Sequence, residues 1–233
     1  NALGLLDKRR RAESGTYLAE GERLVMDLFA YGFSADIVCI LTESAIYDRH
    51  STEFSGVKTY CIPPALCRKL SDTENSQGVF AVVRKPAPAP LSCEKVLFLD
   101  RVRDPGNLGT IIRTAAAFGW RDVVLRGCAD PYAPKTIRSA MGCTLKVNLT
   151  ELSAADVAAA GYRLVCADMD GVPVERYTCS GKICLIIGNE ANGVSDELKQ
   201  AAADCVSVTM RGVESLNASV SAAILMYELN KEN

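Results

Sequence analysis

Two polar loops carry residue types that could act on a substrate, and each follows an apolar run typical of a buried strand. In the first, Asn107 precedes Arg113 by six residues, in a stretch that also holds a proline and two glycines. The second places Glu190 two residues after Gly188. Glycine lets a ligand approach the backbone closely, and amide, carboxylate and guanidinium groups orient polar atoms by hydrogen bonds. Both loops are therefore candidates for a binding or catalytic site.

A third loop, just before the last helical stretch, adds the hydroxyl of Ser215 and the amide of Asn217. Serine and asparagine commonly cap helices, so either residue could simply begin the helix that follows. The same structural role is open to Asn107, and Arg113 could be an exposed helical charge. For the first loop as a whole, the glycines and the proline favour a functional role.

The elements that must position these loops alternate regularly over residues 95–233. Apolar strand-like runs separated by helical stretches predict an α/β fold with a mostly parallel sheet covered on both faces. Ligands bind such sheets at the carboxyl ends of the strands, where all three loops fall. The expected strands are residues 96–99, 123–125, 146–149, 163–167, 183–187 and 206–210, and the expected helices are residues 110–118, 135–141, 154–160, 196–203 and 218–229.

Three prolines that alternate with alanine over residues 86–90 divide the chain. Such a run forms neither a helix nor a central strand and is typical of a semi-rigid linker. We expect a first domain of residues 1–84, a linker of residues 85–94 and a second domain of residues 95–233. Helical and strand-like stretches also alternate in the first domain, which predicts a small α/β fold.

Several protein classes are disfavoured by what the sequence lacks. It contains neither G-x-G-x-x-G nor G-x-x-x-x-G-K-[ST], and its one histidine, His50, lies outside the second domain. These absences argue against a common NAD enzyme, a P-loop NTPase and a Ser-His-Asp hydrolase. The ten cysteines form no C-x-x-C pair, so we expect reduced thiols and no metal site. With no apolar run of about 20 residues and no signal-peptide pattern, we expect a cytoplasmic protein without a membrane partner.

The charge balance, formally −2, argues against a protein that coats nucleic acid non-specifically. A local basic run near the N-terminus, made of Lys8, Arg9, Arg10 and Arg11, is nevertheless a candidate RNA contact. The alternative is that this run is only solvated.

The three loops, in this order and at these spacings, resemble the signature motifs of the SpoU (TrmH-like) branch of the SPOUT RNA methyltransferases. Motif one corresponds to residues 107–119, motif two to residues 187–193 and motif three to residues 210–219, which include the run Ser-Leu-Asn-Ala-Ser. Residues 134–142 are similar to a segment that the family carries between motifs one and two. The resemblance covers essentially the whole second domain.

The first domain resembles the substrate-binding domain that many members carry, which is similar to ribosomal protein L30e. The stretches that carry this likeness are residues 17–25 and 70–79. For the second domain, the resemblance implies a SPOUT fold in which the C-terminal segment makes a deep trefoil knot. It also implies a homodimer.

The resemblance further implies that S-adenosyl-L-methionine (SAM) binds in the knot. The positions matched to cofactor contacts are Gly188, Val208 and Leu216, with Met210 and Asn217 as neighbours. Two positions depart from the usual motif three: Thr209 stands where proline is common, and Ala218 where valine is frequent. Neither departure removes a polar group that the chemistry needs.

The implied activity is SAM-dependent methylation of a ribose 2′-hydroxyl in RNA. Arg113 matches the arginine held to be essential in the family. Asn107, Glu190, Ser215 and Asn217 are expected to position the nucleotide and the loops. Ribosomal RNA is the first expected substrate and transfer RNA the alternative. Three other readings remain open: an inactive RNA-binding paralogue, a base-methylating SPOUT enzyme and a regulatory protein that binds another nucleotide.

Overall fold

The structure is a computed structural model, in which residues 1–213 and 215–231 are described. The chain divides into two compact units, each with its own sheet. The first unit comprises Asn1–Ala87 and Asp130–Leu145, and the second comprises Pro88–Ala129 and Lys146–Asn233.

The first unit contains a four-stranded sheet in the order β1-β4-β2-β3. Strand β4 is antiparallel to β1 and β2, whereas β2 and β3 are parallel. Its elements are η1 (Ala2–Leu6), α1 (Lys8–Ser14), β1 (Thr16–Glu20), α2 (Glu22–Ala30), η2 (Ser34–Asp36), β2 (Ile37–Thr42), α3 (Ser44–His50), β3 (Thr59–Cys61), α4 (Pro64–Leu70), β4 (Val79–Arg84), α6 (Pro134–Ala140) and η3 (Cys143–Leu145).

Alternation along β4 shows how this sheet builds a core on each face. Val79, Ala81 and Val83 pack into a cluster with α2, whereas Phe80 and Val82 pack into a second cluster with η1 and α4. Successive side chains of a strand point to opposite faces. An apolar run of five buried residues therefore requires apolar helices on both sides.

The segment Asp130–Leu145 is the main respect in which the compact units differ from the division expected from sequence. We expected it within the domain of residues 95–233, but Ile137 of α6 lies in the same apolar cluster as Leu24 and Leu28 of α2. The buried guanidinium of Arg11 also reaches Asp130 at 2.6 Å. This packing is long-range, so local sequence patterns could not indicate it.

The second unit contains a six-stranded sheet in the order β10-β8-β9-β5-β6-β7. Every neighbouring pair is parallel, which confirms the expected α/β fold with a parallel sheet. Its elements are β5 (Lys95–Asp100), α5 (Pro105–Phe118), β6 (Asp122–Arg126), β7 (Asn148–Thr150), α7 (Ala154–Ala159), β8 (Arg163–Pro173), η4 (Val174–Arg176), β9 (Ile183–Ile187), α8 (Asp196–Ala201), β10 (Asp204–Ser207) and α9 (Ala218–Glu228).

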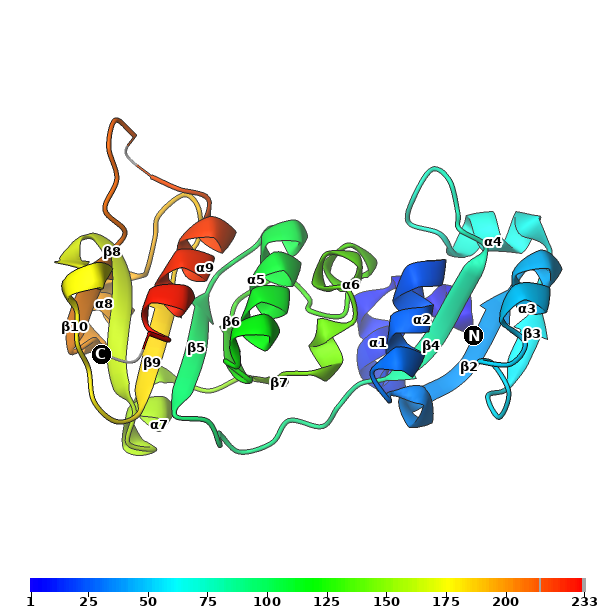
Figure 1. Ribbon diagram of the computed structural model, residues 1–233, viewed down its shortest axis with the longest axis horizontal. Helices are drawn as coiled ribbons and strands as arrows, with labels where there is room; N and C mark the ends of the chain where they lie inside the picture. Colours follow the sequence, from blue (N-terminus) through cyan, green and yellow to red (C-terminus); the bar gives the residue numbers. More distant parts are fainter. Residues whose placement is uncertain (214, 232–233) are drawn as a thin grey trace. The chain divides into compact units, whose positions relative to one another are not determined.

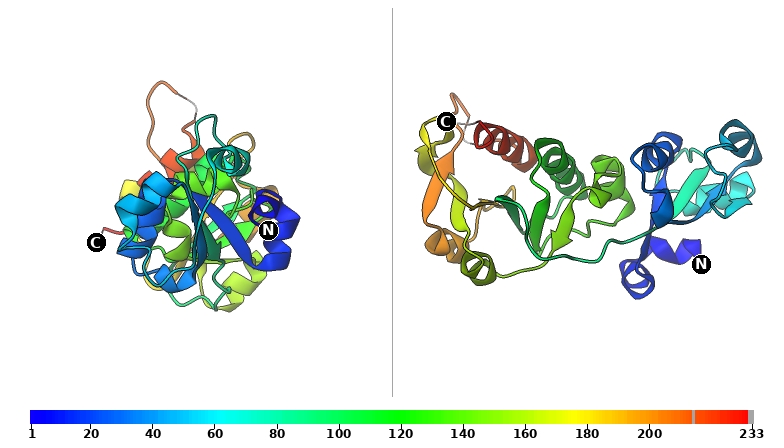
Figure 2. Two further views of the ribbon diagram at one scale, coloured as in Figure 1. Left: turned by 90° about the vertical axis from the view of Figure 1, so that its right-hand side faces the viewer. Right: turned by 60° about the horizontal axis from the view of Figure 1, so that its bottom comes forward.

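Helices cover both faces of the parallel sheet, as expected. Helices α5 and α9 lie side by side on one face, and α7 and α8 lie on the other (Figure 1 and Figure 2). Val157 of α7 and Leu198 of α8 pack in one cluster with Phe98 of β5. No helix among the described residues is long and apolar enough to span a membrane.

Strand bounds differ from expectation mainly near the edge strand β10. This strand ends at Ser207, where we expected it to continue to residue 210, and β8 runs on to Pro173. The register between them shifts after Cys205. Gly171 allows this, because a Cβ there would lie 2.6 Å from the backbone of Cys205 and Val206.

Candidate active site

The three loops predicted to carry chemistry leave the same edge of the parallel sheet. They follow β5, β9 and β10, which end at Asp100, Ile187 and Ser207. Because all the strands are parallel, their carboxyl ends meet at one edge, where open α/β sheets bind ligands.

The first loop shows that Asn107 is not the helix cap that was left open as an alternative. Asp104 caps α5 by accepting a hydrogen bond from the Asn107 amide at 2.8 Å, and Pro105 follows it in the first turn. Proline suits that position because its missing N–H would have no helical partner there. The side chain of Asn107 is thus available for other contacts.

Asn107 joins the three loops. Its Nδ2 donates to Glu190 Oε1 at 2.5 Å, and its Oδ1 accepts from Asn217 Nδ2 at 3.0 Å. Asn217 is also the cap of α9, because its Oδ1 accepts from the amide of Ser219 at 2.9 Å. Three residues predicted from separate motifs therefore form one connected group, and Asn217 has both the structural and the candidate functional role.

The second loop, residues 188–193 (the cavity loop), is closed on itself. Asn189 and Gly193 exchange backbone hydrogen bonds of 3.2 and 3.0 Å, and Asn189 Oδ1 accepts from the amides of Ala191 and Asn192. Gly188 packs directly against Gly193, so a side chain there would collide with the backbone. These contacts give the loop a defined shape without a helix or a strand.

A cavity of about 480 Å³ opens between the cavity loop, the end of β8 and the third loop. Gly188, Val208, Met210 and Leu216, all expected cofactor contacts, line it. Asn217, the fifth such residue, lies beside Leu216 but outside the lining. Ser215 and Glu190, expected to be catalytic, also line the cavity.

The sequence did not indicate the cavity wall that β8 provides. Asp168 and Asp170 line the cavity, and so does Lys199, whose ammonium forms an ion pair with Asp168. The hydrogen bond from Lys199 holds the pKa of the Asp168 carboxyl below its usual range. Asp168 and Asp170 lie in no expected motif, because β8 extends past the end predicted from its apolar run, and Lys199 lies on α8, outside every motif.

In the third loop, Thr209, which stands where the motif usually has proline, makes a contact of its own. The hydroxyl of Thr209 donates to Glu175 Oε1 at 2.7 Å, a hydrogen bond that proline could not form. The same contact holds the pKa of Glu175 below its usual range. Thr209 thus ties the third loop to η4, and Met210 follows directly after it.

Arg113 does not contact the connected group of Asn107, Glu190 and Asn217. It is exposed on α5, and among the described residues its side chain has no hydrogen bond or ion pair. Six residues along a helix correspond to about 9 Å of rise and a different face. The guanidinium of Arg113 is thus free to contact a ligand from outside the protein.

The basic run expected to contact RNA divides in two. Lys8, Arg9 and Arg10 are exposed on α1. Arg11 is buried: its guanidinium donates to Asp130 and to the carbonyl of Leu5. Only the first three therefore offer their side chains to solvent, and Arg11 has a structural role.

The cavity fits the cofactor expected from the sequence. Its volume falls within the roughly 300–1,000 Å³ usual for small-molecule sites. Apolar walls from Val206, Val208 and Leu225 suit a base or an aliphatic chain, while Asp168 offers a carboxylate to a cationic group. No group of three or more potential metal ligands occurs in the described part of the chain.

Comparisons with known proteins support this interpretation. Residues 94–227 match the SpoU rRNA Methylase family, and residues 2–81 match the MRM3-like substrate binding domain. The 23S rRNA (guanosine(2553)-2′-O)-methyltransferase RlmP of Bacillus subtilis is 34% identical, covering 95% of this chain and 91% of the relative. The 23S rRNA (uridine(2479)-2′-O)-methyltransferase of Streptomyces viridochromogenes is 30% identical, covering 97% and 85%.

A solved structure is similar over nearly the whole chain. The SpoU methyltransferase AviRb from Streptomyces viridochromogenes, in complex with the cofactor AdoMet, has a TM-score of 0.84 at 28% identity, covering 98% of this chain and 95% of that one. The family match spans more than half of the chain. As the resemblance of its loops predicted, this chain belongs to the SpoU rRNA methylase family.

Proposed function

We propose that this protein transfers a methyl group from SAM to the 2′-hydroxyl of a ribose in ribosomal RNA. The observation that carries the proposal is the cavity at the carboxyl edge of the sheet. Four expected cofactor residues line it, and the Asn107, Glu190 and Asn217 group lies beside it. The named relatives act on 23S rRNA at the ribose 2′-oxygen, which supports this substrate class over transfer RNA.

When bound, SAM would supply an electrophilic methyl group. The chain's own task is then to hold the ribose hydroxyl in line and to relieve it of its proton, and placement alone can supply several kcal/mol of the barrier. The backbone around Gly188 and the side chains of Val208, Met210 and Leu216 would hold the cofactor.

Arg113 would act on the nucleotide rather than as a base. A guanidinium stays protonated above pH 12, so it cannot take the hydroxyl proton at neutral pH. It can hold a phosphate with two parallel hydrogen bonds and polarise the hydroxyl. Asn107, through Glu190 and Asn217, would keep the three loops in register around the nucleotide, and Ser215 would contact it from the cavity wall.

Recognition of the RNA belongs to the first unit in this proposal. Its match to a substrate-binding domain supports this, as do the exposed side chains of Lys8, Arg9 and Arg10. We also predict a homodimer, a C-terminal knot and a cytoplasmic location. These three predictions come from the sequence.

The test is transfer of labelled methyl from SAM to unmodified 23S rRNA and transfer RNA transcripts. We expect label on a ribose 2′-oxygen of the ribosomal transcript. We expect the Arg113→Ala variant to lose activity by about a hundredfold or more, as when a positioning contact is removed. Arg113→Lys should remain nearly as inactive, because a point charge cannot reproduce the planar fork.

Each alternative has its own outcome. Label on transfer RNA alone would show that transfer RNA, and not ribosomal RNA, is the substrate. Label on a base would point to another SPOUT branch. Absence of SAM binding would identify an inactive RNA-binding paralogue. Near-normal activity of Arg113→Lys would contradict the clamp role while leaving the methyltransferase assignment in place.

A further inference from the structure

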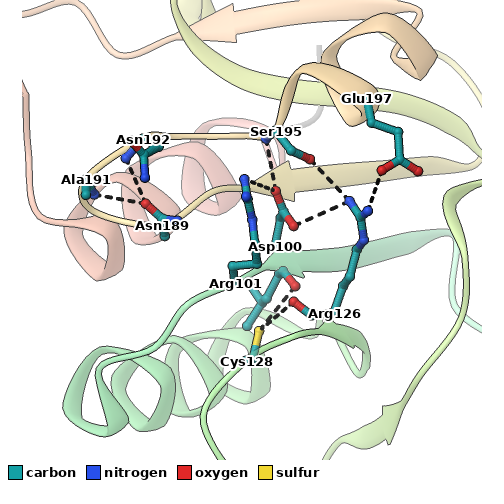
Figure 3. A network of polar contacts seen from close by, with 10 residues as sticks. Asp100, Arg101, Arg126, Cys128, Asn189, Ala191, Asn192, Ser195 and Glu197 are labelled. Carbon is teal, nitrogen blue, oxygen red and sulfur yellow. Dashed lines mark hydrogen bonds and ion pairs between the residues drawn. The ribbon is translucent and has the colours of Figure 1, made fainter.

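A buried carboxylate from β5 lies beneath the cavity loop. Asp100, the last residue of β5, is fully buried at the carboxyl edge of the sheet. Its Oδ2 accepts a hydrogen bond from the backbone amide of Ser195 at 2.9 Å, as Figure 3 shows. Ser195 lies two residues beyond the cavity loop and occupies the N-cap position of α8. Asp100 therefore ties the end of this loop to the central part of the sheet.

Two guanidinium groups accompany this carboxylate. Arg101 donates to Asp100 Oδ2 at 3.2 Å, and Arg126 lies 3.6 Å from Oδ1. Arg126 also donates to the hydroxyl of Ser195 at 3.2 Å and pairs with Glu197 of α8 (Figure 3). Burying a carboxylate is costly unless it is paired. Asp100 has such partners, and it is joined through Ser195 to the end of the cavity loop.

The internal hydrogen bonds of the cavity loop fix its shape but not its position relative to the sheet. The Asn189–Gly193 bridge and the turn around Asn189 are local to the loop. The contact with Asp100 sets where that shape lies relative to β5. At its tip, Glu190 is held by Asn107, which follows β5 in the chain. The last residue of β5 thus holds the loop at its base, and Asn107 in the segment after β5 holds it at its tip.

We propose that Asp100 is a positioning residue for the cofactor: by accepting the Ser195 amide it holds the cavity loop in the conformation that receives SAM. This inference rests on the proposed function, because it takes the cavity to be the SAM site. Asp100 does not line the cavity, so it would act through the loop.

The backbone N–H and the side-chain hydroxyl of Ser195 make separate contacts, with Asp100 and with Arg126, and this allows a matched test. Ser195 has φ −64° and ψ 149°, which proline adopts without strain. Ser195→Pro removes the hydroxyl and the N–H, whereas Ser195→Ala removes only the hydroxyl. The difference between the two variants therefore isolates the hydrogen bond to Asp100.

We expect Ser195→Pro to bind SAM about tenfold more weakly than Ser195→Ala by titration calorimetry, the order for losing a hydrogen bond to a charged acceptor. The KM for SAM should rise with it, while kcat at saturating SAM changes by less than about threefold. Ser195→Pro should also melt at a lower temperature than Ser195→Ala, because the buried carboxylate loses a donor, so SAM binding is measured well below both transitions. A residue that only stabilised the fold would lower the melting temperature without this split between KM and kcat.

Equal SAM affinities in the two variants, with the wild type binding SAM, would overturn the positioning role of Asp100. A wild type that does not bind SAM would instead overturn the proposed function. If Ser195→Pro does not fold, Asp100→Ala, which removes both acceptor oxygens, takes its place. Normal SAM affinity in that variant would likewise overturn the proposal.

Discussion

Among single residues, Gly188 shows how little space the candidate site leaves. Its position in the chain suggested a backbone that a ligand approaches, and it does line the cavity. The structure adds a second reason for glycine there. A Cβ atom would lie 1.9 Å from the carbonyl carbon of Gly193 and 2.1 Å from the amide nitrogen of Val194. Both neighbours are backbone atoms, so neither can move without opening the cavity loop.

Gly188→Ala should therefore weaken SAM binding by at least about tenfold, the order of the cost of overpacking a closed site. Titration calorimetry of the folded variant measures this. Gly4→Ala is the matched control, because its backbone is not in the left-handed region, a Cβ there would meet only the Arg10 side chain at 3.6 Å, and Gly4 is outside the cavity. A Gly188→Ala protein with wild-type affinity would show that the loop closes differently in solution.

Among the elements, β6 depends on one carboxylate at its first residue. Asp122 Oδ2 accepts from the amides of Ser92 and Cys93, both at 2.7 Å, and Oδ1 accepts from Asn148 Nδ2 at 2.7 Å. The side chain thus joins the end of the linker, the start of β6 and the edge strand β7. Burial would raise the pKa of Asp122, but these hydrogen bonds outweigh it and hold the pKa below its usual range.

A carboxyl group with a lowered folded pKa stabilises the protein above its unfolded pKa. That contribution is lost as pH falls through the folded value. Asp122→Asn should lower the free energy of unfolding by about 1–3 kcal/mol at neutral pH. The difference from wild type should stay constant above about pH 5 and shrink below about pH 4. Urea unfolding across this range measures it, and a difference that grows on acidification would refute the assignment.

In the whole molecule, the chain crosses between the two units more than once. After β6 it enters the first unit as Asp130–Leu145 and then returns. Within the first unit, Arg11 and Asp130 form a buried ion pair, and the rings of Tyr17 and Tyr132 lie 5.2 Å apart. The first unit is therefore complete only with residues that follow β6. We expect a fragment of residues 1–84 to be unstable.

Arg11→Met should destabilise the first unit by about 1–3 kcal/mol, because it leaves the partly buried Asp130 carboxylate without its charged partner. The double variant Arg11→Met with Asp130→Asn should lose less, since no buried charge remains. Hydrogen exchange of the β1 amides reports on the first unit. The fluorescence of Trp120, the one tryptophan of the chain, reports on the second and should be unchanged. Equal losses in both variants would show that the pair adds nothing beyond packing.

The sequence by itself determined the class of fold and indicated several of the residues that line the cavity. Strand β9 was predicted residue for residue, because an apolar run between polar turns is a local signal. The cavity residues Gly188, Val208, Met210 and Leu216 followed from ordered motifs. Their convergence followed from the rule that parallel strands end at one edge.

The tertiary structure decided what depends on contacts between distant segments. In the structure Asp104 caps α5. The side chain of Asn107 instead bonds to Glu190 and Asn217, which lie 83 and 110 positions further along the chain. Arg11, which the sequence placed in an exposed basic run, is buried and forms an ion pair with Asp130. Periodicity and spacing report on neighbours along the chain, whereas pairing and burial depend on which segments pack together.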